Sequence, residues 1–181
     1  MSIATRTGDS GSTGLMYNRR ISKSHPRVEA YGSVDELNAA MGVARAQAVE
    51  TFLRESLLVI QKDLIVLMGE LATAPEDRDR YVRDGFQLVT PELTAKLDRW
   101  VAEIEAQKVS FKGWATPGGT VTSAALDVAR TNCRRAERRV FALSEMGQQT
   151  NAEIIVYLNR LSDLLWLMAR WDETKTGGDA G

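Results

Sequence analysis

The chain has 181 residues and a mass of 20.0 kDa, a size at which a single domain can bury its own core. A net charge of -1 and a pI near 5.9 argue against nucleic-acid binding through overall charge. The single cysteine excludes an intramolecular disulfide, and no apolar run is long enough to cross a membrane. We therefore expect a cytoplasmic protein that binds neither membranes nor nucleic acid.

The first half of the chain predicts an irregular arm followed by two helices. Residues 1–27 lack helical periodicity and are rich in Gly, Ser and Thr. A helix over 33–48 is predicted because Ser33-Val34-Asp35-Glu36 has the pattern of a capping box, and apolar residues follow at helical spacing. A second helix, over 52–72, is apolar around much of its circumference, so we expect it to be covered on more than one side.

The second half predicts three more helices and no strand. Residues 73–89 are charged and irregular, and Thr90-Pro91 then predicts a helix that runs to about 108. Pro117-Gly118-Gly119 interrupts the chain before a fourth helix over 121–144, and a capping box at Thr150–Glu153 predicts a fifth to about 171. The sequence thus predicts one all-α domain, 1–181, divided into an arm (1–27), a five-helix up-and-down bundle (28–172) and a disordered tail (173–181).

The fourth helix carries five arginines between positions 130 and 139. At about 100° per residue, Arg130, Arg134 and Arg138 share one quadrant with Glu137. Like charges four residues apart repel by roughly 0.2–0.5 kcal/mol per pair, so this row favours an anion-binding surface over a merely solvated face. An apolar stripe runs beside the row and places it at the edge of a core; its members are Ala129, Cys133, Ala136, Val140 and Leu143.

The arm has the composition of a polyphosphate-binding loop. Glycines at 8, 11 and 14 let backbone N–H groups turn toward an anion, while Arg6, Arg19, Arg20 and Lys23 add positive charge. It is not a Walker A loop, because no Gly-Lys-Ser/Thr closes it. A Gly- and Ser-rich start is by itself more often a flexible tail, but its pairing with an arginine helix favours phosphate binding, because both segments suit the same kind of ligand.

Three other polar features leave alternatives open. Asp35 either stabilises the dipole of its helix or accepts from an arginine of the fourth helix, in this subunit or a neighbour. Arg160 and Asp163 either form an internal pair that fixes helix register or face a ligand. Trp114 either covers the core or packs against a flat ligand. We expect no metal site from side chains alone, since the lone histidine and the lone cysteine have no neighbouring ligands.

Five segments, in order and at matching spacing, resemble the PduO-type ATP:cob(I)alamin adenosyltransferases. They are Thr5-Arg-Thr-Gly-Asp-Ser-Gly-Ser-Thr13, Arg27-Val-Glu-Ala-Tyr-Gly-Ser-Val-Asp35-Glu-Leu-Asn38, Pro117-Gly-Gly119, Arg130-x-x-Cys-Arg134-Arg-Ala-Glu137-Arg-Arg139 and Tyr157-Leu-Asn159-Arg160-Leu-Ser-Asp163. The resemblance implies a five-helix bundle that assembles as a homotrimer, with ATP at the subunit interfaces and cobalamin beside it.

The resemblance also implies a reaction. The 5′-deoxyadenosyl group of ATP is transferred to cob(I)alamin and triphosphate is released, with Mg²⁺ held by the ATP phosphates. Cob(I)alamin is itself a strong nucleophile, so the protein would act by positioning and electrostatics. A flavoprotein reductase and a cobalamin-dependent acceptor enzyme are implied partners. The alternatives are a non-catalytic ATP- or cobalamin-binding carrier or sensor, and a scaffold whose arginines bind acidic protein or RNA.

The matching positions imply specific roles. Arg130 is implied to pair with Asp35 across the interface and to help place the corrin, and these two act with Arg134 in catalysis. Trp114 stands where the family usually has phenylalanine, an aromatic residue on the corrin side that helps to exclude the lower axial base. Asn18 replaces a usual glycine, which fits the tolerance of Asn for a left-handed backbone. The implied ATP-binding residues are Thr5, Arg6, Thr7, Gly8, Asp9, Gly11, Ser12, Thr13, Lys23, Arg134, Glu137, Arg138 and Asn159.

Overall fold

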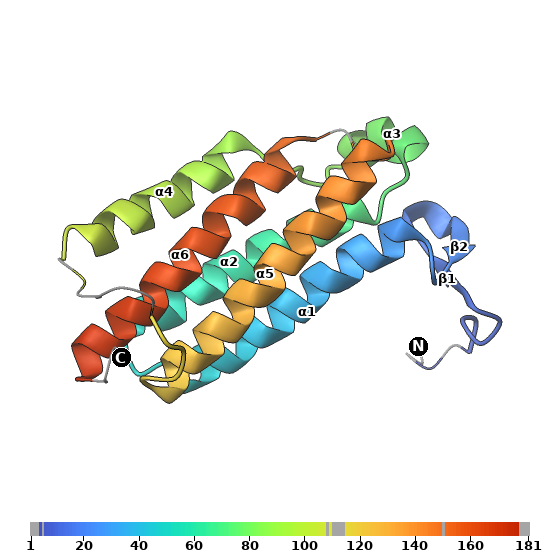
Figure 1. The fold of residues 1–181 in the computed structure, drawn as a ribbon. Coiled ribbons are helices and arrows are strands. Elements are labelled where there is room, and N and C mark those ends of the chain that lie inside the picture. Colours follow the sequence, from blue (N-terminus) through green and yellow to red (C-terminus); the bar gives the residue numbers. More distant parts are fainter. Residues whose placement is uncertain (1–3, 5, 108, 110–114, 150, 178–181) are drawn as a thin grey trace.

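Five long helices run up and down beside one another (Figure 1). They are α1 (Pro26–Gln47), α2 (Thr51–Leu71), α4 (Pro91–Glu105), α5 (Val121–Glu145) and α6 (Glu153–Thr176). The computed structural model describes residues 4, 6–107, 109, 115–149 and 151–177. Helix α5 packs between α1 and α6, α2 packs on α1, and α4 packs on the outer side of α6. The predicted five-helix bundle is confirmed.

The core forms where the apolar faces of these helices meet. Every member of the predicted α5 stripe, from Ala129 to Leu143, has no exposed surface. The predicted inner face of α6 is buried in the same way, including Ile154, Leu158 and Leu165. Burial of one such large aliphatic side chain contributes about 1.5–3 kcal/mol, so the stripe determines how α5 is rotated about its own axis.

The predicted start of the first helix is wrong. Helix α1 begins at Pro26, two residues before the predicted bundle, because Pro26 has a backbone suited to the first turn and His25 caps it. The His25 Nδ1 accepts a hydrogen bond from the backbone N–H of Arg27 at 3.0 Å. Ser33 is not a cap but a buried residue within the helix, where its hydroxyl donates to the carbonyl of Ala30 at 2.8 Å.

The predicted limits of the last helix also differ from the structure. Thr150 lies outside the described residues; α6 begins at Glu153, whose N–H donates to Asn151 Oδ1 at 3.1 Å. The helix continues to Thr176, so the expectation of disorder from residue 173 is wrong for the first four residues of that tail. Glu173 is buried in an ion pair, and this pairing extends the helix into a segment whose composition is typical of a solvated end.

Two segments predicted to be irregular contain short elements. The connection after α2 holds the 3-10 helix η2 (Pro75–Asp77) and the helix α3 (Arg78–Arg83). The arm holds the strands β1 (Ser12–Gly14) and β2 (Arg20–Ser22) on either side of the 3-10 turn η1 (Met16–Asn18). Strands of three residues are too short to show the period-two alternation by which a strand is predicted.

One expectation for α2 is not met within this chain. Its inner face is buried at Leu57, Ile60 and Leu64, but Leu58 and Ile65 on the outer side are 39% and 60% exposed. The helix is therefore covered on one side by the rest of the bundle and leaves an apolar strip in solvent.

Arg27 joins three segments at the end of the bundle that carries the arm. Its Nη1 donates to the carbonyls of Leu71 (2.8 Å) and Thr73 (2.9 Å), and its Nη2 donates to the carbonyl of Gln148. Burial lowers the pKa of this guanidinium, and the three carbonyls offset part of that cost by accepting hydrogen bonds from its N–H groups. The end of α2, the α5–α6 connection and the base of the arm are thereby held in one arrangement.

We predict that Cys133 is unreactive in the folded protein. Burial raises the pKa of its thiol, and the Sγ–H donates to the Leu158 carbonyl at 3.2 Å. Because the thiolate is the reactive form, Ellman's reagent at mildly alkaline pH should leave the native protein unlabelled and label one thiol after denaturation. Fast labelling of the native protein would contradict the packing of α5 against α6.

Candidate functional site

The arm is built on a small hairpin. β1 and β2 are antiparallel, with Thr13 opposite Ile21 and Gly14 opposite Arg20. The turn between them needs a left-handed backbone at Tyr17 (φ 61°) and at Asn18 (φ 60°). Asn adopts this conformation more readily than most residues, so the expectation for Asn18 is confirmed.

The glycine loop before the hairpin is closed by two basic side chains. The Nη2 of Arg20 donates to the carbonyls of Thr7 at 2.6 Å and Ser12 at 3.0 Å, and it also reaches Ser12 Oγ. Lys23 lies over Gly8 so closely that a Cβ there would sit 3.2 Å from its Nζ. Gly11 has a φ of +81°, which favours glycine.

Arg20 is a residue of the arm whose position the sequence analysis missed. From the sequence alone Arg20 adds only positive charge, because its role depends on the pairing of two strands that are too short to predict. Its contacts with both sides of the glycine loop give that loop a defined shape. The predicted loop residues Arg6, Thr7, Asp9 and Thr13 belong to the same segment, while Thr5 lies outside the described residues.

The turn of the hairpin is attached to the segment that follows α2. The N–H of Met16 donates to the Ala72 carbonyl at 3.0 Å, and Arg19 forms an ion pair with Asp77. The guanidinium of Arg80 lies 4.1 Å from the centre of the Tyr17 ring. The arm is thus anchored at the end of the bundle where α1 begins (Figure 1).

The five arginines of α5 divide into two groups. Arg135 pairs with Glu36, Arg139 pairs with Glu29 at 3.1 Å, and Arg130 pairs with Asp127 at 2.9 Å. Arg134 and Arg138 are exposed and form no ion pair with any described residue. Arg135 and Arg139 join α5 to α1, Arg130 is held by a carboxylate of its own helix, and Arg134 and Arg138 leave two positive charges facing outward.

Glu137 and Asn159 complete this surface. The Nδ2 of Asn159 on α6 donates to Glu137 Oε1 on α5 at 3.1 Å. A hollow of about 470 Å³ lies beside this pair; its lining includes Arg134, Glu137, Arg138, Phe141 and Ile155. The structure therefore brings together Arg134, Glu137, Arg138 and Asn159, as predicted. The surface offers cationic, carboxylate and amide groups around an apolar floor.

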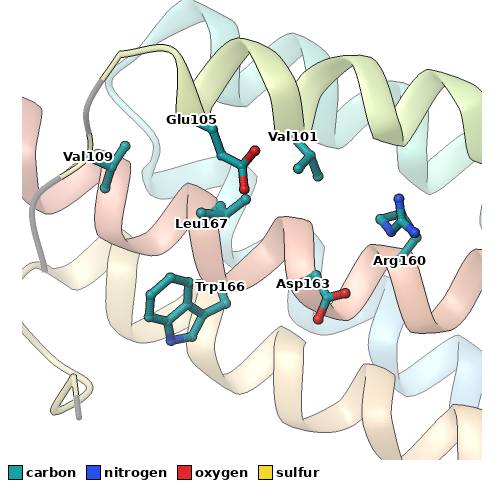
Figure 2. A pocket seen from close by; sticks show the side chains of 7 residues that line it. All are labelled: Val101, Glu105, Val109, Arg160, Asp163, Trp166 and Leu167. Carbon is teal, nitrogen blue, oxygen red and sulfur yellow. The ribbon is translucent and has the colours of Figure 1, made fainter. Parts of the chain in front are cut away.

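A second hollow, of about 660 Å³, lies between α4 and α6 (Figure 2). Val101, Trp166 and Leu167 supply apolar surface, and Glu105, Arg160 and Asp163 lie around it. Asn159, Asp163 and Trp166 are four and three residues apart, so they share one face of α6 that connects the two hollows. We call the second hollow the α4/α6 groove.

Other predicted site features have different outcomes. Arg160 does form an ion pair within the bundle, but its partner is Asp98 of α4 and not Asp163. Asp35 is exposed and forms no ion pair with any described residue, so this chain alone does not bring it to Arg130. Trp114 lies outside the described residues.

Neither a metal cluster nor a membrane span is found in the part of the chain that the structure describes. No group of three or more His, Cys, Asp or Glu residues there is arranged to hold a metal ion. None of the described helices combines the length and the apolar character needed to span a bilayer.

Comparison with known proteins identifies relatives along most of the chain. The corrinoid adenosyltransferase of Citrobacter freundii is 41% identical over 172 residues and covers 95% of both chains. The cobalamin adenosyltransferase of Cupriavidus metallidurans is 40% identical over 97% of this chain and 90% of its own. The corrinoid adenosyltransferase PduO of Salmonella typhimurium is 38% identical over 96% of this chain, which spans 50% of that protein's length.

Solved structures agree with these relatives. A variant of the PduO-type ATP:corrinoid adenosyltransferase from Lactobacillus reuteri, complexed with cobalamin and ATP, superposes with a TM-score of 0.88 at 33% identity. The match covers 98% of this chain and 96% of that one. The sequence profile of the family described as cobalamin adenosyltransferase matches residues 3–172. The chain belongs to the cobalamin adenosyltransferase family.

Proposed function

We propose that this chain transfers the 5′-deoxyadenosyl group of ATP to cob(I)alamin. The cobalt of the reduced corrinoid attacks C5′ of ATP, a Co–C bond forms, and the C5′–O bond breaks. The bonding electrons leave with the triphosphate, and the product is adenosylcobalamin. Because the corrinoid substrate supplies the nucleophile, the chain needs groups that orient C5′ and stabilise the triphosphate as it leaves.

The observation that carries this proposal is a pair of arginines that form no ion pair with any residue that the structure describes. Arg134 and Arg138 line a hollow together with Glu137 and Glu145, and Asn159 is held beside it by the hydrogen bond that it donates to Glu137. Guanidinium groups bind phosphate oxygens through two parallel hydrogen bonds, while a carboxylate and an amide suit ribose hydroxyls and a base. The surface therefore has the chemistry of a nucleoside triphosphate site.

The α4/α6 groove is the position we assign to the corrin. Its apolar lining suits the face of a large flat ring, with Trp166 as an aromatic wall. Asn159 and Trp166 are separated by about 10 Å along α6 at a rise of about 1.5 Å per residue. A nucleotide at one hollow and a corrin at the other would therefore meet over the face of α6 that bears Asp163.

We infer that the site is completed by a second copy of the chain in a homotrimer. Asp35 is exposed and lacks an ion pair here, which leaves it available to Arg130 of a partner subunit. The exposed strip at Leu58 and Ile65 adds an apolar surface.

The remaining features of the proposal follow from the reaction. Mg²⁺ would be held chiefly by the ATP phosphates, because the described residues contain no cluster of three or more His, Cys, Asp or Glu side chains suited to hold it. A reductase, such as a flavoprotein, must supply cob(I)alamin, and a cobalamin-dependent enzyme would receive the product. We expect these events in the cytoplasm, with residues 1–181 acting as one domain.

One assay tests the function directly. The protein is incubated anaerobically with ATP, Mg²⁺ and chemically reduced cobalamin, and adenosylcobalamin and inorganic triphosphate are measured. Formation of both in equal amounts supports the transferase. Saturable binding of ATP and cobalamin without either product would instead indicate a carrier or sensor. Binding of RNA that falls steeply with salt would indicate a scaffold that binds through its arginines.

We predict that Arg134→Ala lowers kcat/KM at least tenfold, or about 1.4 kcal/mol of transition-state stabilisation. The reason is the loss of a guanidinium at the triphosphate. The matched control is Arg139→Ala, which removes an arginine of the same helix whose ion pair with Glu29 lies outside the hollow. Equal kinetics for the two variants would remove Arg134 from the site.

We predict that Arg20→Ala raises the KM for ATP several-fold. The variant frees the two sides of the glycine loop, so binding the triphosphate must order the loop first. Arg20→Lys should restore only part of the affinity, because the shorter lysine side chain does not carry its ammonium to the position that Nη2 of Arg20 occupies between the two sides of the loop. Arg19→Ala, which removes the ion pair with Asp77 but leaves the loop closed, should have the smaller effect. A larger effect from Arg19→Ala would contradict the role of Arg20.

A further inference from the structure

A row of buried, alternating charges links the interior of the bundle to Arg130. Glu173 and Arg170 are each 1% exposed and Asp127 is 3% exposed. The Nε and Nη2 of Arg170 donate to the two carboxylate oxygens of Glu173 at 2.7 and 2.9 Å. The same Nη2 donates to Asp127 Oδ2 at 2.7 Å, and Asp127 Oδ1 accepts from the Nε of Arg130 at 2.9 Å.

Four charges in this position are costly unless each is fully paired. Removing a charge from water costs several kcal/mol. Attraction to an opposite charge offsets this cost only where the pair has good geometry and its remaining polar atoms are hydrogen-bonded. Burial by itself would lower the pKa of Arg170, but its hydrogen bonds to the carboxylates of Glu173 and Asp127 raise it overall. Arg170 therefore stays charged and holds the carboxylate of Asp127 in one orientation.

That orientation determines where Arg130 points. Asp127 is one helical turn before Arg130 on α5, and both of its oxygens are committed, one to each arginine. Arg130 is only a quarter exposed, and the single hydrogen bond described for its side chain is through Nε. Held at Nε, the guanidinium keeps its two terminal NH₂ groups for a partner beyond Asp127.

The same buried arginine also lies against the wall of the α4/α6 groove. The guanidinium carbon of Arg170 is 5.8 Å from the centre of the Trp166 ring. This is within the range of a cation–π contact, which fixes the plane of an indole as well as its position. Trp166 is the aromatic residue of the groove that we assign to the corrin.

We propose that Asp127 and Arg170 are positioning residues for corrinoid binding: they aim Arg130 and fix Trp166 without touching the corrinoid themselves. This inference rests on the proposed function, because it takes Arg130 and Trp166 as the groups that meet the corrinoid. It assigns the buried charges a role beyond holding α5 to α6.

The test is a double-mutant cycle of Asp127→Asn with Arg130→Ala. Two quantities are measured on the intact protein: the Kd for cobalamin, from quenching of tryptophan fluorescence, and the KM for ATP in adenosyl transfer. Asp127→Asn keeps the shape of the side chain but removes its charge. The matched control is Asp172→Asn, which neutralises a buried carboxylate on α6. Asp172 accepts a hydrogen bond from Thr120 and has none with Asp127, Arg130 or Arg170.

We expect Asp127→Asn to raise the Kd for cobalamin by about tenfold while changing the KM for ATP by less than about twofold. In the Arg130→Ala background the same change should alter the Kd by less than about twofold, because there is no longer a guanidinium to aim. Asp172→Asn should leave the Kd for cobalamin near that of the unmodified chain. An Asp127→Asn effect that persists undiminished without Arg130, or that Asp172→Asn matches, would overturn the proposal.

The same measurements remain informative if a variant does not fold or if the unmodified chain lacks activity. If Asp127→Asn does not fold, Asp127→Glu replaces it in the cycle, since it keeps the buried charge and shifts the carboxylate by one methylene. If the unmodified chain binds cobalamin but transfers nothing, the proposed function fails while the Kd cycle still tests the positioning role. If the unmodified chain binds no cobalamin, both proposals fall.

Discussion

The rotation of α5 about its own axis is the constraint on which the rest of the molecule depends. The stripe from Ala129 to Leu143 is wholly buried between α1 and α6, and this leaves no freedom in the direction of the other side chains. Arg135 and Arg139 turn toward the glutamates of α1, while Arg134 and Arg138 turn toward α6 and solvent. A change that slips α5 by one residue would exchange paired and unpaired arginines and remove the hollow beside Glu137.

The pairing of some arginines with carboxylates explains how α5 remains stable with five arginines in ten residues. Like charges four residues apart destabilise a helix, and Arg130, Arg134 and Arg138 form such a series. Asp127 neutralises the first, and Glu137 lies one turn after Arg134 and directly before Arg138. Some repulsion remains between Arg134 and Arg138, and an anionic ligand would relieve it. Binding of the triphosphate and stability of α5 are therefore expected to be coupled, because a ligand that binds only the folded state stabilises that state.

Much of the fold follows from periodicity, and the errors have identifiable causes. Long helices are predictable because their apolar stripes repeat over several turns, as at Leu53, Leu57, Ile60 and Leu64 on α2. The start of α1 was misplaced because a histidine serves as its cap, a role that Ser33 fits better by composition alone. The end of α6 was placed too early because Glu173 is charged, and only the fold shows that its partner Arg170 is equally buried.

The candidate site likewise contains some residues that the sequence predicts and others that only the folded structure reveals. Glu137 and Asn159 were predictable because helical spacing and the resemblance of their motifs place them on facing helices. Arg20 and Asp127 were missed because each acquires its role through a tertiary contact: a hairpin register in one case, a buried arginine 43 residues away in the other. Local sequence determines which groups are available, and tertiary pairing determines which remain free to meet a ligand. Among the residues that the structure describes, Arg134 and Arg138 form no ion pair, and these are the groups that the adenosyl-transfer proposal requires.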